Sequence, residues 1–89
     1  MRRHLVITVS GRVQGVFFRG TAKEEADRLG ISGYARNEPD GSVRIEAEGE
    51  AGALDRFVAW CGRGPDFADV KAVTVHEGGG GHFSGFTIA

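Results

Sequence analysis

The chain has 89 residues, of which 40% are hydrophobic and 26% are charged. This length suits one domain, residues 1–89, with one hydrophobic core. The net charge is −1, so the chain has no overall positive field that would recruit nucleic acid or an anionic membrane. A single cysteine excludes an internal disulfide bond and a cysteine-based metal cluster. The N-terminus lacks the apolar stretch of a signal peptide or a membrane span, which predicts a cytoplasmic protein.

The first quarter of the chain predicts a strand followed by a helix. Apolar side chains alternate along residues 5–10, with both faces fairly apolar, as expected of a central strand. Residues 19–29 carry apolar side chains at helical intervals and charged ones on the other face. Gly30 follows directly, and glycine at this position commonly ends a helix.

The next segment predicts a hairpin. Residues 31–38 and 42–49 have strand character, and they flank the turn sequence Pro39-Asp40-Gly41, in which we expect Asp40 to be the turn residue. The second of these strands alternates most regularly. Its apolar side chains predict a buried face, and its charged side chains, those of Arg44, Glu46 and Glu48, predict a face that meets water.

The second half of the chain predicts a helix and two strands. Residues 50–62 carry an apolar stripe at helical spacing that includes Cys61, which we expect in the core. Residues 70–77 are strongly strand-like, and residues 83–88 can form a short returning strand. The four glycines at 78–81 predict a flexible connection between these strands.

The order of these elements, β-α-β-β-α-β, predicts a fold class. It matches the ferredoxin-like split βαβ arrangement of α+β proteins, in which two helices cover one face of an antiparallel sheet and the other face meets water. The strand at residues 83–88 would add a short fifth member.

The stretch from Gly11 to Arg19 leaves the first strand, enters the first helix, and has the features of an anion-binding loop. Gly11 and Gly15 free the backbone to turn its N–H groups inward, and the first N–H groups of a helix lack intrahelical partners. Arg19 adds a planar guanidinium that matches phosphate oxygens. On spacing alone, a tight turn followed by a surface arginine explains these residues equally well.

A second segment favours the anion-binding interpretation. Side chains alternate in a strand, so Asn37, at the end of the strand before the hairpin turn, shares a face with Ala35 and Gly33. These small neighbours leave Asn37 room beside a ligand. We therefore expect Asn37 to take part in the same site as Arg19.

Together, the two segments resemble the motif pair of the acylphosphatase family, on the residues Gly11-x-Val13-Gln14-Gly15-Val16-x-Phe18-Arg19 and Gly33-x-x-x-Asn37-x-x-Asp40-Gly41-x-Val43. The later Gly64-Pro65 and Phe86-x-Ile88 also resemble the family pattern, so the similarity covers essentially the whole chain. The resemblance implies a small, monomeric enzyme, a hydrolase that cleaves acyl phosphates to a carboxylate and inorganic phosphate without a metal ion or cofactor.

The resemblance also implies roles for individual residues. The phosphate-binding arginine falls on Arg19, and the water-positioning asparagine falls on Asn37. The phosphate-binding loop would consist of Arg12, Val13, Gln14, Gly15, Val16, Phe17 and Phe18. Two departures stand out, because Phe17 occupies a position where many members carry glycine and Tyr34-Ala35 replaces a more frequent aromatic-valine pair. We expect Gln14 to bond within the loop.

Other residues and functions receive less support. His4, His76 and His82 lie outside both motifs and are expected at the surface or at strand edges. An RNA-recognition module would need aromatic side chains on the exposed strand face, and a metal-trafficking module would need a cysteine pair. The main alternative is a non-hydrolytic phosphate-binding module, like the acylphosphatase-like domains embedded in hydrogenase-maturation proteins. Because the domain accounts for all 89 residues, we expect a free-standing enzyme.

Overall fold

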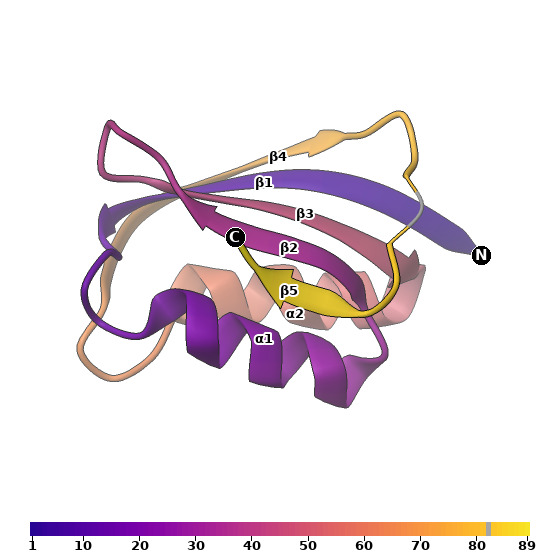
Figure 1. Ribbon diagram of the computed structural model, residues 1–89, viewed down its shortest axis with the longest axis horizontal. Coiled ribbons are helices and arrows are strands. Elements are labelled where there is room, and N and C mark those ends of the chain that lie inside the picture. The colour runs from indigo at the N-terminus through magenta and orange to yellow at the C-terminus, as the bar shows by residue number, and fades with distance from the viewer. Residues whose placement is uncertain (82) are drawn as a thin grey trace.

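The computed structural model describes residues 1–81 and 83–89, which form a five-stranded sheet with two helices on one of its faces (Figure 1). His82, expected at the surface, lies outside the described residues. In chain order the elements are β1 (Arg2–Arg12), α1 (Phe18–Leu29), β2 (Ser32–Asn37), β3 (Val43–Glu50), α2 (Ala51–Arg63), β4 (Asp69–Glu77) and β5 (Phe86–Ile88). Neither helix has the length and apolar character that crossing a bilayer requires, within the part of the chain described.

The sheet has the strand order β4-β1-β3-β2-β5. β1 pairs antiparallel with β3 and β4, and β2 pairs antiparallel with β3. The predicted βαββαβ order and the two helices on one face are confirmed. The sheet is not wholly antiparallel, however, because the chain crosses from β4 to the opposite edge and β5 enters parallel to β2 (Figure 1).

The core lies between the sheet and the helices. The alternation predicted for the first strand is observed, with Leu5, Ile7 and Val9 buried toward the helices, and β1 is longer than predicted because it has partners on both sides. Cys61 of α2 is fully buried as expected, and burial raises the pKa of its thiol to about 12. The remaining members of the core cluster are Val13, Val16, Phe18, Ala22, Ala26, Ile31, Ala35, Val43, Ile45, Ala47, Leu54, Phe57, Trp60 and Phe86.

Two local devices fix the elements that carry the predicted site residues. Gly30 ends α1 in a left-handed conformation with a φ of 71°, and the next N–H, from Ile31, donates to the carbonyl of Ala26 at 2.8 Å. In the hairpin, Oδ1 of Asp40 accepts from the hydroxyl and the N–H of Ser42 at 2.6 and 2.9 Å, which lowers the pKa of the Asp40 carboxyl. The predicted end of the first helix at Gly30 and the predicted hairpin turn at Asp40 are thus confirmed.

The face of the sheet away from the helices is not exposed to solvent at every position. His4, predicted at the surface, is only 7% exposed, and its Nε2 lies 2.9 Å from Oε1 of Glu46. The connection at residues 78–81, predicted to be flexible, passes over it: the N–H of Gly78 donates to the His4 carbonyl, and a Cβ at Gly78 would come within 2.2 Å of the imidazole. His76 is exposed, as predicted.

Candidate active site

A pocket of about 380 Å³ lies where the loop after β1, the start of α1, the end of β2 and β5 meet. Both Arg19 and Asn37 line it, so the structure brings the two predicted catalytic residues into one cavity. The full lining consists of Val13, Gly15, Phe17, Phe18, Arg19, Gly20, Asn37 and Ile88.

The loop between β1 and α1 is held by side chains that enter the core. Val13, Val16 and Phe18 are buried, and the ring of Phe18 packs against Trp60 of α2 with centroids 5.2 Å apart. Gly15 and Phe17, which lie between these anchors, are exposed. The loop is therefore fixed from below while its outer side stays open to the pocket.

The backbone of the loop forms a concave set of N–H donors. Gly15 and Phe17 both have positive φ, 74° and 62°, whereas Val16 between them does not. Such alternation turns successive N–H groups to one side and creates an anion-binding nest. The N–H groups of residues 14–18 donate to no acceptor in the described part of the protein, and no side chain caps α1. These donors are available to a bound anion.

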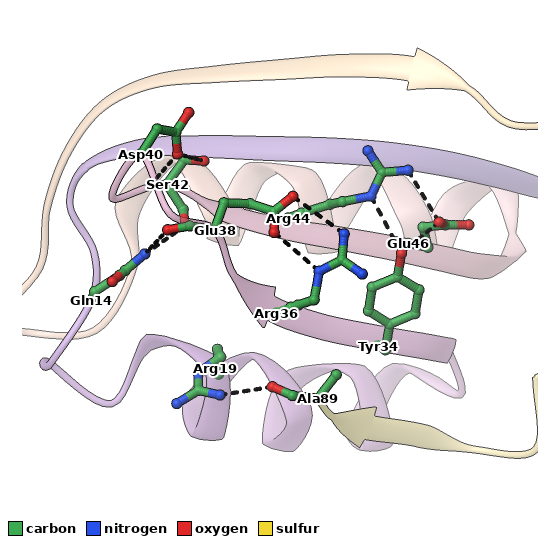
Figure 2. A network of polar contacts seen from close by, with 10 residues as sticks. All are labelled: Gln14, Arg19, Tyr34, Arg36, Glu38, Asp40, Ser42, Arg44, Glu46 and Ala89. Atoms are coloured by element: carbon green, nitrogen blue, oxygen red, sulfur yellow. Dashed lines mark hydrogen bonds and ion pairs between the residues drawn. The ribbon is translucent and has the colours of Figure 1, made fainter.

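The guanidinium of Arg19 is held by the last residue of the chain. Its Nη1 donates to the main-chain oxygen of Ala89 at 2.9 Å (Figure 2). The N–H of Ala89 in turn donates to the carbonyl of Ala35, which continues the pairing of β5 with β2. Because a guanidinium has five N–H donors, this contact orients the group and leaves other donors for a ligand.

Asn37 offers an acceptor without a partner. It is the last residue of β2, and its Oδ1 is buried yet accepts no hydrogen bond within the described residues. Leaving a buried polar atom unpaired costs about 1–3 kcal/mol, so such an atom commonly marks the place of a ligand or a bound water. A water molecule in the pocket would supply the missing donor.

Gln14 joins the loop to the hairpin. Its Nε2 donates to the carbonyl oxygens of Glu38 and Ser42 at 2.8 and 2.9 Å, as Figure 2 shows. Our expectation that Gln14 bonds within the loop is therefore wrong, because the side chain reaches the neighbouring hairpin instead.

The predicted loop residues divide into two groups. Val13, Gly15, Phe17 and Phe18 line the pocket, whereas Arg12, Gln14 and Val16 do not. Arg12 is the exposed last residue of β1, and it lies opposite Asp69 in the pairing of β1 with β4. Gly20 and Ile88 also line the pocket and Ala89 contacts Arg19, although the two sequence motifs predict no role for them. Phe86-x-Ile88 resembles the family pattern, and this resemblance is the signal that could have pointed to Ile88.

Comparison with known proteins identifies the family. The sequence pattern of the family described as acylphosphatase matches residues 5–88. An acylphosphatase from Nocardioides sp. (strain ATCC BAA-499 / JS614) is 54% identical over 78 residues, which are 88% of this chain and 79% of that protein.

Solved structures agree. The crystal structure of acylphosphatase from Bacillus subtilis superimposes with a TM-score of 0.93 at 38% identity, covering 100% of this chain and 99% of that one. An acylphosphatase structure from Coxiella burnetii gives a TM-score of 0.95 at 33% identity and covers 99% of this chain and 93% of that one. The chain therefore belongs to the acylphosphatase family of hydrolases.

Proposed function

We propose that Arg19, Asn37 and the loop at residues 12–18 form the site at which this acylphosphatase hydrolyses acyl phosphates to a carboxylate and inorganic phosphate, without a metal ion or cofactor. The observation that carries the proposal is the meeting, in one pocket, of a guanidinium, unpaired backbone donors and the unpaired Oδ1 of Asn37. The first two suit a phosphoryl group, and the third suits a water molecule.

The phosphoryl group binds the nest and Arg19. Phosphoryl transfer spreads negative charge over the equatorial oxygens, and it asks the protein mainly for positioning and for charge stabilisation. Donors that are already oriented provide both without rearrangement during the reaction. The contact between Arg19 and Ala89 contributes to this preorganisation, since it fixes the guanidinium before substrate arrives.

The attacking water donates a hydrogen bond to Oδ1 of Asn37, which aims its oxygen at phosphorus. As the new P–O bond forms, the bond from phosphorus to the carboxyl oxygen breaks and its electron pair leaves with the carboxylate. The water proton passes to a phosphate oxygen of the substrate itself. None of the lining residues is Asp, Glu or His, so this transfer to the substrate phosphate uses no carboxylate or imidazole of the pocket.

The leaving group needs no proton donor. Its conjugate acid is a carboxylic acid with a pKa of about 4, by comparison with Asp and Glu side chains, so the carboxylate is stable at neutral pH. The chemistry therefore fits a pocket that contains one charged side chain, Arg19, and one amide, Asn37.

The enzyme acts as a cytoplasmic monomer, and neither nucleic acid nor a membrane is its partner. Every residue to which we assign a role lies in this chain, so the proposed chemistry does not call for a second copy. A free, buried thiol at Cys61 suits a reducing compartment. The chain carries a net charge of −1, so it has no overall positive field for nucleic acid or an anionic membrane. The substrate and product of the family are small anions, which the local donors of the loop suffice to bind.

The test compares Arg19→Ala and Asn37→Ala in benzoyl phosphate hydrolysis with a chelator present, alongside calorimetric titration with inorganic phosphate. Arg19→Ala should lose phosphate binding and about 10²- to 10³-fold or more in rate. Asn37→Ala should lose turnover and still bind phosphate. The control is Arg36→Ala. Arg36 is exposed and directly precedes Asn37, and its guanidinium forms an ion pair with Glu38.

Two results would contradict the proposal. Binding of phosphate by the unmodified protein, without turnover above the buffer rate, would indicate the non-hydrolytic binding module. Equal loss of phosphate binding in Asn37→Ala and Arg19→Ala would remove the water-positioning role from Asn37.

A further inference from the structure

Two exposed apolar side chains flank the phosphate pocket. Phe17 is 85% exposed and Ile88 is 47% exposed, and both line the cavity that contains Arg19 and Asn37. We propose that Phe17 and Ile88 bind the acyl group of the substrate, so that the enzyme prefers acyl phosphates with an uncharged, apolar and above all aromatic acyl group. This inference rests on the proposed function, because it concerns the other end of the same substrate.

Nothing in the fold itself explains an aromatic residue at position 17. The ring is almost fully exposed, so it adds little to the core. Its backbone adopts the left-handed conformation, with a φ of 62° and a ψ of 24°, which is unfavourable for a bulky residue and free of cost for glycine. Backbone strain of this kind, which costs about 1–3 kcal/mol, concentrates at functional positions.

The loop aims the Phe17 side chain outward. Its two neighbours, Val16 and Phe18, are both buried and hold the loop to the core from either side. The ring therefore stands at the mouth of the pocket on a fixed backbone. Aromatic rings offer a large, flat contact surface and lose little conformational freedom when they bind.

Ile88 reaches the same pocket from the opposite end of the chain, and it too has a fixed base. Phe86, two residues earlier in β5, is buried against Phe57 with ring centroids 6.0 Å apart. On the other side of Ile88, the N–H of Ala89 donates to the carbonyl of Ala35 at 2.9 Å. The two apolar residues thus form a preformed rim rather than a surface that must first be ordered.

The chemistry of the lining selects the class of acyl group. Arg19 is the one charged side chain in the lining, and the proposed function engages it with the phosphate. A second carboxylate or a strongly polar acyl group would meet the apolar rim and find no charged partner there, so its desolvation would not be offset. A pocket of about 380 Å³ falls within the range of about 300–1,000 Å³ typical of small-molecule sites.

The experiment measures kcat and KM for benzoyl phosphate and acetyl phosphate, which share the phosphate end and differ in the acyl group. Phe17→Asn removes the ring with a residue that tolerates the left-handed conformation. It should raise the KM for benzoyl phosphate about 10-fold relative to the KM for acetyl phosphate, because the lost contact is made to the acyl group. Because the backbone of Phe17 belongs to the proposed phosphate loop, the readout is this ratio, in which an effect on the shared phosphate end cancels. Ile88→Ser should change the ratio in the same direction.

Matched controls come from exposed apolar residues outside the pocket. Phe67→Asn alters a phenylalanine that is 79% exposed, and Val75→Ser alters a residue that is 40% exposed. Both should leave the ratio of the two substrates unchanged. Phe17→Tyr keeps the ring and should also preserve the ratio.

The outcomes separate this inference from the proposed function. An equal loss on both substrates in Phe17→Asn would show that the residue acts through the shape of the loop and would overturn the inference. An unchanged substrate ratio in both Phe17→Asn and Ile88→Ser would overturn it as well. Failure of the proposed function would look different, since the unmodified protein would then hydrolyse neither substrate above the buffer rate.

Discussion

The side-chain amide of Gln14 bridges two segments of the site through the main chain of Glu38, whose carbonyl it contacts at 2.8 Å. Gln14 lies in the loop that carries the phosphate donors, and Glu38 directly follows Asn37. The same nitrogen also contacts the carbonyl of Ser42 on the far side of the turn. Gln14 therefore sets the position of the phosphate loop relative to the residue that we propose to position the water.

Replacing Gln14 should lower the catalytic rate more than it weakens the binding of inorganic phosphate. Gln14→Ala leaves the nest and Arg19 in place but releases the loop from the hairpin, and misplacement by about 1 Å can cost about 10²-fold in rate. We expect kcat to fall about 10- to 100-fold, with a smaller change in the inhibition constant for inorganic phosphate. A steady-state comparison of kcat with phosphate inhibition checks this, and a variant with the original kcat would refute the positioning role.

Gly33 should not tolerate a side chain. Its φ is 146°, and a Cβ there would lie 1.8 Å from the carbonyl oxygen of Glu46 on β3, so the backbone of the ladder would have to move. We expect Gly33→Ala to lower the free energy of unfolding by about 3 kcal/mol or more. Chemical denaturation measures the loss. The matched control is Gly52→Ala in α2, where the added methyl meets nothing within 4 Å and should stabilise the helix by about 0.5–1 kcal/mol.

Glu46 should make the fold sensitive to acid. A hydrogen bond from the Tyr34 hydroxyl lowers the pKa of its carboxyl, and Arg44 adds to the effect (Figure 2). His4 lowers this pKa further, and burial opposes the shift. Because the folded pKa is lowered, the stabilisation is complete above the ordinary value of 4.5 and is lost as pH falls through the folded pKa.

Glu46→Gln should therefore be less stable than the unmodified protein at pH 7, by about 1 kcal/mol, and the difference should shrink below about pH 4.5. Melting temperatures followed by circular dichroism from pH 3 to 8 provide the test. Glu24→Gln on the exposed side of α1 serves as the control. A constant difference between Glu46→Gln and the unmodified protein across the pH range would contradict the assignment.

Cys61 should be unreactive while the protein is folded. The thiolate is the nucleophilic form, and burial both shields the sulfur and raises its pKa to about 12. A thiol reagent such as Ellman's reagent should label the native protein at pH 8 only as fast as it unfolds, and it should label the protein at once in guanidinium. Rapid stoichiometric labelling in native buffer would show that α2 opens locally.

Local sequence patterns predicted most of the elements. Strand periodicity predicted the alternation along β1, in which Leu5, Ile7 and Val9 are buried, and the same rule placed Asn37 on the face of Ala35. These predictions succeeded because strand periodicity is a property of neighbouring residues. Arg19 and Asn37 line one pocket. The family resemblance implied a shared site for them, whereas the spacing of the loop alone did not decide between an anion site and a tight turn.

Features that depend on distant segments could not be predicted in this way. His4 looked like a strand-edge residue, and it is buried because the connection at residues 78–81 crosses the sheet above it. The parallel pairing of β5 is a second case, since periodicity says nothing about which edge a late strand joins. For the same reason, the contact of Ala89 with Arg19 became visible only in the folded chain.

The contact between Arg19 and Ala89 spans 70 positions of the chain. Closing so large a loop has an entropic cost, and long-range pairings tend to form late in folding. The guanidinium acquires its orienting partner only when the three-residue strand β5 docks beside β2. In a refolding experiment, recovery of activity should consequently follow the arrival of the last strand, and it should lag behind the recovery of helical signal.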